Sequence, residues 1–233
     1  MFNYIFLLLI DEEHFIIIKF SMVIDTYYLF LISFVRTKIG KRNTRLAIVL
    51  IQSGVSMPGE DTGAAEKAAT LCASCDLPAK HLFVLPHSDT HLLGYTVRLE
   101  NALSEIAGGF YLGELKSVRG HKDYLNKTTH QLLFVRHQFK MGFHNEMRND
   151  PQNAVKNYSQ AYHHLVELRS TDTNLHEIRI VSSVINYKIC KLDFLLNLPR
   201  DAIAQFRRHI DMFRQKTGPK ELIFEHYAWL SKQ

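Results

Sequence analysis

Three histidines occur at seven-residue intervals in the middle of the chain, at His130, His137 and His144. On a helix they would form one stripe, a possible metal ladder or proton relay. Successive rings would lie about 10 Å apart along the axis, too far to share a zinc ion, whereas zinc-binding pairs on a helix are four residues apart. The adjacent His163 and His164 would point to different faces. We therefore expect these histidines to pack between helices and expect no metal site.

The chain has three cysteines, of which Cys72 and Cys75 have CxxC spacing and Cys190 stands alone. A zinc site would need a second pair or nearby histidines, and a thioredoxin-type motif would follow a strand and open a helix. This pair instead closes an alanine-rich segment. So few cysteines in a chain of this length indicate free thiols in a reducing compartment rather than a disulfide scaffold.

No phosphate-binding or nucleophilic motif stands out. The loop after the first predicted central strand, residues 53–61, lacks both GxGxxG and a GK[ST] ending, and no GxSxG elbow occurs. Paired carboxylates such as Glu100 with Glu105, or Glu221 with Glu225, are equally explained as solvated helix faces. We expect no catalytic residues, no cofactor and no enzymatic activity. An enzyme built on this half of the chain would need a phosphate loop or a paired acid and base.

The elements that would position these residues change type along the chain. A buried strand over 45–52, a helix over 62–75, a strand over 81–86 and a helix from 89 to about 108 form a βαβ pattern, which predicts a small, mostly parallel sheet. From about residue 118 only helical periodicity remains. The predicted helices cover residues 121–147, 152–169, 174–197 and 200–216.

Two of these helices resemble each other. Asn-Ala-Val-Lys-Asn-Tyr at 153–158 aligns with Asp-Ala-Ile-Ala-Gln-Phe at 201–206, forty-eight positions later, and each phrase opens on an N-cap residue type. A repeat of this length suits helical hairpins of the tetratricopeptide (TPR) kind. The predicted fold is therefore an α/β part followed by an α-solenoid of TPR-like hairpins.

The predicted helix 121–147 is the clearest candidate for binding a partner. Its apolar residues recur at helical spacing and are surrounded by hydrogen-bonding side chains. We expect Leu132, Val135, Arg136 and Phe139 to form a structural or interaction surface on a central strut.

Composition supports a packed protein: 46% of the 233 residues are hydrophobic, and the formal net charge is +5. The basic cluster between 36 and 45 could contact phospholipid or nucleic acid. A solvated linker explains it better, so we expect no nucleic-acid partner.

Residues 1–36 form an atypical hydrophobic segment. They lack the basic start and small-residue cleavage site of a signal peptide. Residues 14–35 approach the length of a spanning helix, although Lys19 and Asp25 would each cost a few kcal/mol in a bilayer. Residues 4–10 resemble a buried parallel strand. The expected domains are the segment 1–36, an α/β domain over 37–117 and a helical solenoid over 118–233.

Several phrases resemble one known family. The longest is Asn-Lys-Thr-Thr-His-Gln-Leu-Leu-Phe-Val-Arg-His-Gln-Phe-Lys at 126–140; others lie at 45–52, 58–61, 82–87, 98–102, 185–191, 201–211 and 224–233. Together they resemble the foie gras domain family found in subunit 11 of the trafficking protein particle (TRAPP) complex, from about residue 40 onward.

The resemblance implies a non-enzymatic scaffold subunit of a vesicle-tethering complex in endoplasmic reticulum to Golgi transport. Its partners would be other TRAPP subunits and, indirectly, a Rab GTPase. It would be cytoplasmic and peripheral to Golgi and intermediate membranes. Family members are longer and more polar before the first strand, so we expect a truncated foie gras region in which 1–36 is a gene-model artefact. The alternative is a membrane-anchored helical interaction protein using residues 14–35.

Overall fold

The computed structural model describes residues 2–10, 15–21, 37, 44–52, 62–74, 76–86, 89–171 and 174–233. The chain divides into two compact units, Met1–Ala107 and Gly108–Gln233. The long helix α3, Asp89–Asp123, contributes residues to both. Each unit is described by itself below.

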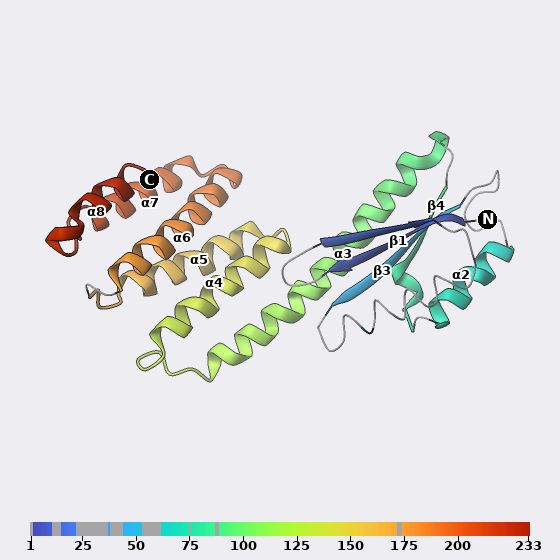
Figure 1. The fold of residues 1–233 in the computed structure, drawn as a ribbon, viewed down its shortest axis with the longest axis horizontal. Helices are drawn as coiled ribbons and strands as arrows, with labels where there is room; N and C mark the ends of the chain where they lie inside the picture. Colours follow the sequence, from blue (N-terminus) through green and yellow to red (C-terminus); the bar gives the residue numbers. More distant parts are fainter. Residues whose placement is uncertain are drawn as a thin grey trace. The chain divides into compact units, whose positions relative to one another are not determined.

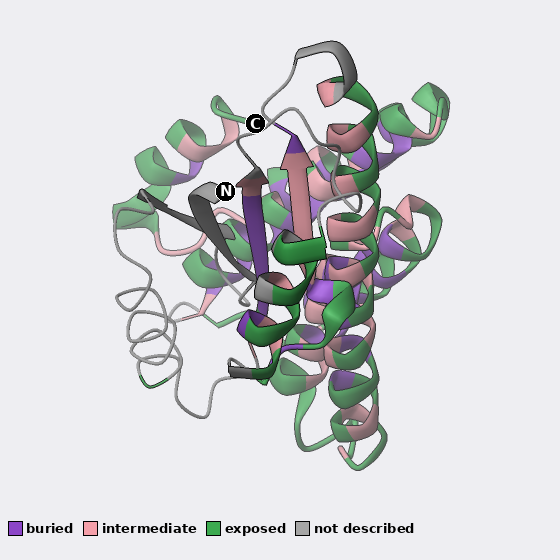
Figure 2. Ribbon diagram, turned by 90° about the vertical axis from the view of Figure 1, so that its right-hand side faces the viewer, coloured by how far each residue is buried: buried purple, intermediate pink, exposed green. Residues whose placement is uncertain are grey.

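The first unit contains a four-stranded sheet in the order β2-β1-β3-β4 (Figure 1). Its strands are β1 (Phe2–Ile10), β2 (Phe15–Ser21), β3 (Arg45–Gln52) and β4 (Leu82–Pro86). Strands β3 and β4 run parallel, with Ile48 opposite Leu82, and helix α2 (Thr62–Ser74) lies between them in the chain. Residues 46–50 of β3 are all buried, as the uninterrupted apolar run predicts for a central strand (Figure 2).

The expectation of a parallel strand over residues 4–10 is wrong. Strand β1 is antiparallel to both of its neighbours, with Leu7 paired to Ile18 on one side and to Ile48 on the other. Only four residues separate β1 from β2, which permits a hairpin but not the long crossover of a parallel pair. The sheet is therefore mixed, with its parallel pair at β3–β4.

One side of the central strands packs against the beginning of α3. Ala47 and Val49 alternate along β3 and are buried beneath a partly buried layer that includes Leu99 and Leu103 of α3. Before β4, the buried His81 forms a hydrogen bond from Nδ1 to the carbonyl of Leu46 (3.0 Å). This bond ties the start of β4 to β3.

The second unit is a series of antiparallel helical hairpins (Figure 1). Its helices after α3 are α4 (Gln131–Met147), α5 (Pro151–Val166), α6 (Leu175–Leu195), α7 (Pro199–Arg214) and α8 (Ile223–Leu230). Neighbours in the chain are neighbours in space from α4 to α7. The predicted fold class, an α/β part followed by a solenoid of helical hairpins, is confirmed.

The forty-eight-residue repeat extends well beyond the two phrases that suggested it. Asn149 and Asn197 both take positive φ, at 57° and 60°, and each lies two residues before a proline that opens the next helix. Equivalent positions on α5 and α7 are buried: 154 with 202, 157 with 205, 161 with 209, and 165 with 213. The same turn and the same core-facing stripe therefore occur twice. The helices begin at the prolines, so neither Asn153 nor Asp201 is an N-cap.

The predicted continuous helix 121–147 is also wrong. The chain leaves α3 at Asp123 and resumes helical structure at Gln131. Between them, the Asn126 side chain accepts hydrogen bonds from the backbone N–H of Thr128 (2.9 Å) and Thr129 (3.4 Å). A side chain that binds the backbone in this way competes with helical hydrogen bonds and stabilises a turn.

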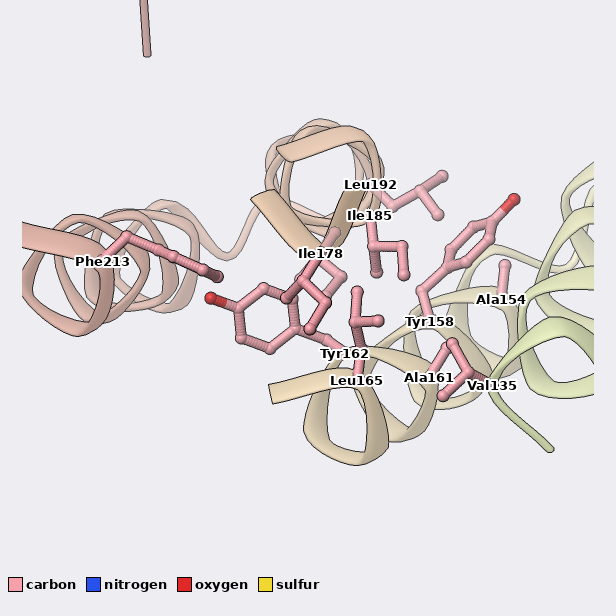
Figure 3. Close-up of a cluster of buried hydrophobic side chains, with 11 residues drawn as sticks. Val135, Ala154, Tyr158, Ala161, Tyr162, Leu165, Ile178, Ile185, Leu192 and Phe213 are labelled. Atoms are coloured by element: carbon pink, nitrogen blue, oxygen red, sulfur yellow. The ribbon is translucent and has the colours of Figure 1, made fainter. Parts of the chain in front are cut away.

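The core of the helical unit is a cluster of eleven buried residues contributed by α4 to α7. Figure 3 shows Ile178, Ile185 and Leu192 on one side of α6, directed at Tyr158 and Tyr162 of α5. Helix α8, which the sequence analysis missed, joins this core through Trp229, whose indole N–H donates to the hydroxyl of Ser183 (3.1 Å).

Candidate functional site

A hollow of about 330 Å³ lies between α4, the end of α5 and the beginning of α6. Its walls are mainly apolar. They comprise Leu132, Val135, Arg136 and Phe139 from α4, Leu165 and Leu168 at the end of α5, and Asn174, Glu177, Ile178 and Val181 at the start of α6. Arg136 and Glu177 contribute charges from different helices. An apolar recess with a few polar groups suits a hydrophobic side chain of a partner.

All four residues predicted for the interaction surface line this hollow, but they differ in burial. Val135 is 5% exposed and belongs to the core cluster, whereas Leu132 is 67% exposed. Phe139 packs against the core and contacts the Tyr158 ring, with centroids 5.3 Å apart. Arg136 is exposed. The α4 surface therefore combines core anchors with residues that a partner could reach.

Sequence reasoning missed the α6 side of the hollow. Val181 is 42% exposed and Ile178 is buried, although both lie on one apolar helix. The apolar periodicity of α6 gave no signal that these residues would lie opposite α4.

An ion pair fixes α4 against α6. The Lys188 ammonium lies 2.9 Å from Glu146 Oε2, and the Tyr158 hydroxyl of α5 donates to the same carboxylate oxygen (2.8 Å). Burial raises the pKa of Tyr158, and the adjacent Glu146 carboxylate raises it further, so the hydroxyl remains a donor. Three helices are thus joined through one carboxylate beside the core.

The histidines that could have done chemistry lie apart. His130 Nδ1 contacts the Thr129 hydroxyl (2.8 Å), and His137 Nδ1 donates to the Leu133 carbonyl (2.7 Å). His144 is buried against the rings of Tyr111 and Phe143. His163 and His164 both approach Glu167, at 3.2 Å and 3.6 Å. Within the described part of the chain, no three His, Cys, Asp or Glu side chains gather as a metal ion requires.

Of the cysteines, Cys72 and Cys190 are half-buried free thiols. Burial raises the pKa of each thiol, which keeps it protonated and poorly nucleophilic at neutral pH. Cys75 lies outside the described residues, as does most of the basic cluster at 36–45.

Two other histidines are fully buried where α7 and α8 meet the core, His209 and His226. His209 Nδ1 accepts from the Tyr162 hydroxyl (2.8 Å), and its Nε2 donates to Gln233 Oε1 (3.3 Å). Burial lowers the pKa of both imidazoles, and the positive charge of Arg179 lowers that of His226 further. The folded state therefore favours their neutral forms.

We expect this arrangement to make the helical unit less stable in acid. In the unfolded chain these histidines bind protons near their ordinary pKa of 6.5, whereas in the folded chain they do so only at lower pH. Their contribution is fully present above pH 6.5 and is lost as the pH falls from there through the folded-state pKa. Calorimetry from about pH 7.5 to about pH 5 should show Tm falling, by about 2–4 °C for each kcal/mol lost.

A His209→Gln variant removes one of the two groups. Its Tm at neutral pH should be lower, because the ring contacts with Phe213 and Trp229 are lost, but its fall with acid should be shallower. An unchanged slope in this variant would show that His209 does not sense the pH.

Strand β2 contradicts part of the membrane-anchor alternative, which needs a helix over residues 14–35. Residues 15–21 of the segment 14–35 form strand β2, whereas residues 22–35 lie outside the described residues. Among the residues that the structure describes, no helix combines the length and apolar character needed to cross a membrane.

Comparison with known proteins gives a consistent result. Residues 174–233, which comprise α6 to α8 with the N-cap Asn174, match the Foie gras liver health family 1. Three relatives carry the name trafficking protein particle complex subunit 11. The chain is 56% identical to the one from Gallus gallus and 55% identical to those from Bos taurus and Homo sapiens, each over 203 residues.

These matches cover 87% of this chain and 18% of each relative. Over most of its length the chain is therefore similar to one part of the proteins named trafficking protein particle complex subunit 11.

Proposed function

We propose that this chain is a non-enzymatic scaffold segment of a TRAPP-type vesicle-tethering complex in endoplasmic reticulum to Golgi transport. Its direct partners would be other subunits of that complex, through which it would act indirectly on a Rab GTPase. It would be cytoplasmic and peripheral to Golgi and intermediate membranes.

The observation that carries this proposal is the 55–56% identity to proteins named as a subunit of a trafficking complex. The matches cover 87% of this chain. The helical unit also has features that are typical of binding surfaces. They are an apolar recess, exposed apolar side chains and an ion pair that joins its helices.

The hollow indicates where one such contact would form. Leu132 and Val181 are apolar, partly exposed and placed on different helices around the same recess. A partner side chain entering there would bury both residues and would lie near Arg136 and Glu177, which could fix its orientation.

The test is isolation of the full protein from cells, with the other TRAPP subunits quantified by mass spectrometry. The double variant Leu132→Asp, Val181→Asp places two carboxylates in the recess. We expect recovery of at least one subunit to fall roughly tenfold, since an unpaired charge in an apolar contact removes more than 1.4 kcal/mol.

The matched control is Ile203→Asp on α7, where the side chain is 47% exposed and does not line the hollow. It should leave recovery unchanged. If the wild-type protein brings down no TRAPP subunits, the proposed function is wrong. If the double variant recovers them all normally, the hollow is not the contact.

A further inference from the structure

Helix α6 is apolar on both of its faces. One face supplies Ile178, Ile185, Ile189 and Leu192 to the core. The opposite face carries Ile180, Val184, Tyr187 and Phe194, whose side chains are 47–64% exposed. Exposed apolar side chains gathered along one face of a helix are typical of an interface.

The outer residues follow a strict pattern. Positions 180, 184, 187, 191 and 194 are separated by four, three, four and three residues, which is the heptad spacing of a coiled-coil seam. Four of the five positions are apolar, and Lys191 occupies the fifth. We call these five residues the α6 seam; they extend about 21 Å along the helix.

Lys191 distinguishes the seam from a simple apolar stripe. Its neighbour Lys188 is already paired with Glu146, whereas Lys191 forms no ion pair with any residue that the structure describes. Its neighbours one turn away on α6, at positions 187, 188, 194 and 195, include no acid. A single charge within an apolar seam sets the register of pairing and favours an opposite charge across from it.

We propose that the α6 seam binds an amphipathic helix from a different protein, with apolar residues at heptad spacing and an aspartate or glutamate facing Lys191. Charge favours this occupant over a second copy of the chain aligned in the same direction, because such a copy would bring Lys191 against Lys191. The acid Glu177 lies in line with the seam, one turn before Ile180, and no basic face surrounds the seam as membrane-surface helices require.

This inference goes beyond the proposed function. The seam begins next to the α6 residues that line the hollow, but the two positions tested below, Tyr187 and Lys191, lie about 9 Å and about 15 Å along the helix from Val181. The partner of the seam need not be a TRAPP subunit. A variant that loses binding at the hollow would therefore still allow binding at the α6 seam to be tested, and the reverse also holds.

The experiment places the photo-cross-linking amino acid p-benzoylphenylalanine at Tyr187 in the full protein in cells and identifies the linked peptide by mass spectrometry. We expect a peptide from another protein, with apolar residues three and four apart and an acid in register with Lys191. The control places the same probe at Tyr227 of α8, which is similarly exposed at 58% and should give different products.

A charge exchange then tests the pairing. Lys191→Glu should reduce the Tyr187 cross-link roughly tenfold, and changing the facing acid of the identified partner to lysine should restore it. Arg200→Glu, the same charge reversal at an exposed α7 position, should leave the cross-link unchanged. Cross-links to lipid, to a second copy or within the same chain, no cross-link at all, or a cross-link insensitive to Lys191→Glu would each overturn the proposal.

Discussion

Replacing Gly142 by alanine should destabilise the helical unit by about 3 kcal/mol, although alanine is the better helix former. A Cβ at this position would lie 2.6 Å and 2.7 Å from two ring carbons of Tyr158. That ring is fully buried in the core and held by its hydrogen bond to Glu146, so it has no free space to move into. The clash exceeds the helix-propensity gain of about 1 kcal/mol. Urea denaturation should show the midpoint shifted strongly downward.

A double-mutant cycle separates this clash from other causes. Tyr158→Ala alone should cost about 3–5 kcal/mol, because it removes the largest fully buried side chain of the core. In that background Gly142→Ala should be neutral or slightly stabilising, since no ring remains to collide with. Equal destabilisation by Gly142→Ala in both backgrounds would show that the tight approach of α4 to α5 does not matter.

The repeat was predictable from sequence because it depends on local chemistry. Proline can begin a helix and asparagine tolerates positive φ, so the pairs Asn149 with Pro151 and Asn197 with Pro199 encode the same turn. The central strands were predictable for a similar reason, since the apolar run at 45–52 matches β3 residue for residue. Local signals of this kind need no knowledge of the rest of the fold.

The break between α3 and α4 was harder to predict, because apolar periodicity continues through it. The Asn126 side chain decides the local structure there, and no hydrophobic pattern reports it. Helix α6 was ambiguous for another reason. When both faces are apolar, periodicity cannot say which one meets the core, and that depends on the neighbouring helices.

The candidate site shows the same limit. Leu132 and Val135 lie in one predicted stripe, yet only Val135 reaches the core formed with α5 and α6. Sequence placed these residues on one helix but could not separate the residues that hold the fold from those that remain exposed.

Because Val135 is buried and Leu132 is exposed, substitution by aspartate should affect stability very differently at the two positions. Val135→Asp should destabilise the helical unit by several kcal/mol, because it buries a carboxylate among Ala161, Leu165 and the rest of the core cluster, enough to unfold a marginally stable domain. Leu132→Asp should change stability by only about 0.5 kcal/mol, since that side chain is already two-thirds exposed. Circular dichroism during thermal unfolding measures both.

Valine to threonine provides the matched control at the buried position. Val135→Thr keeps the shape but buries a hydroxyl, and it should fall between the wild type and the aspartate variant. If Val135→Asp unfolds at the wild-type temperature, α4 does not pack as the structure shows. If Leu132→Asp unfolds as early as Val135→Asp, then Leu132 belongs to the core and the hollow beside it is not free to receive a partner. Stability and partner binding at these two positions are therefore separable, because Val135 is buried in the core cluster and Leu132 is two-thirds exposed.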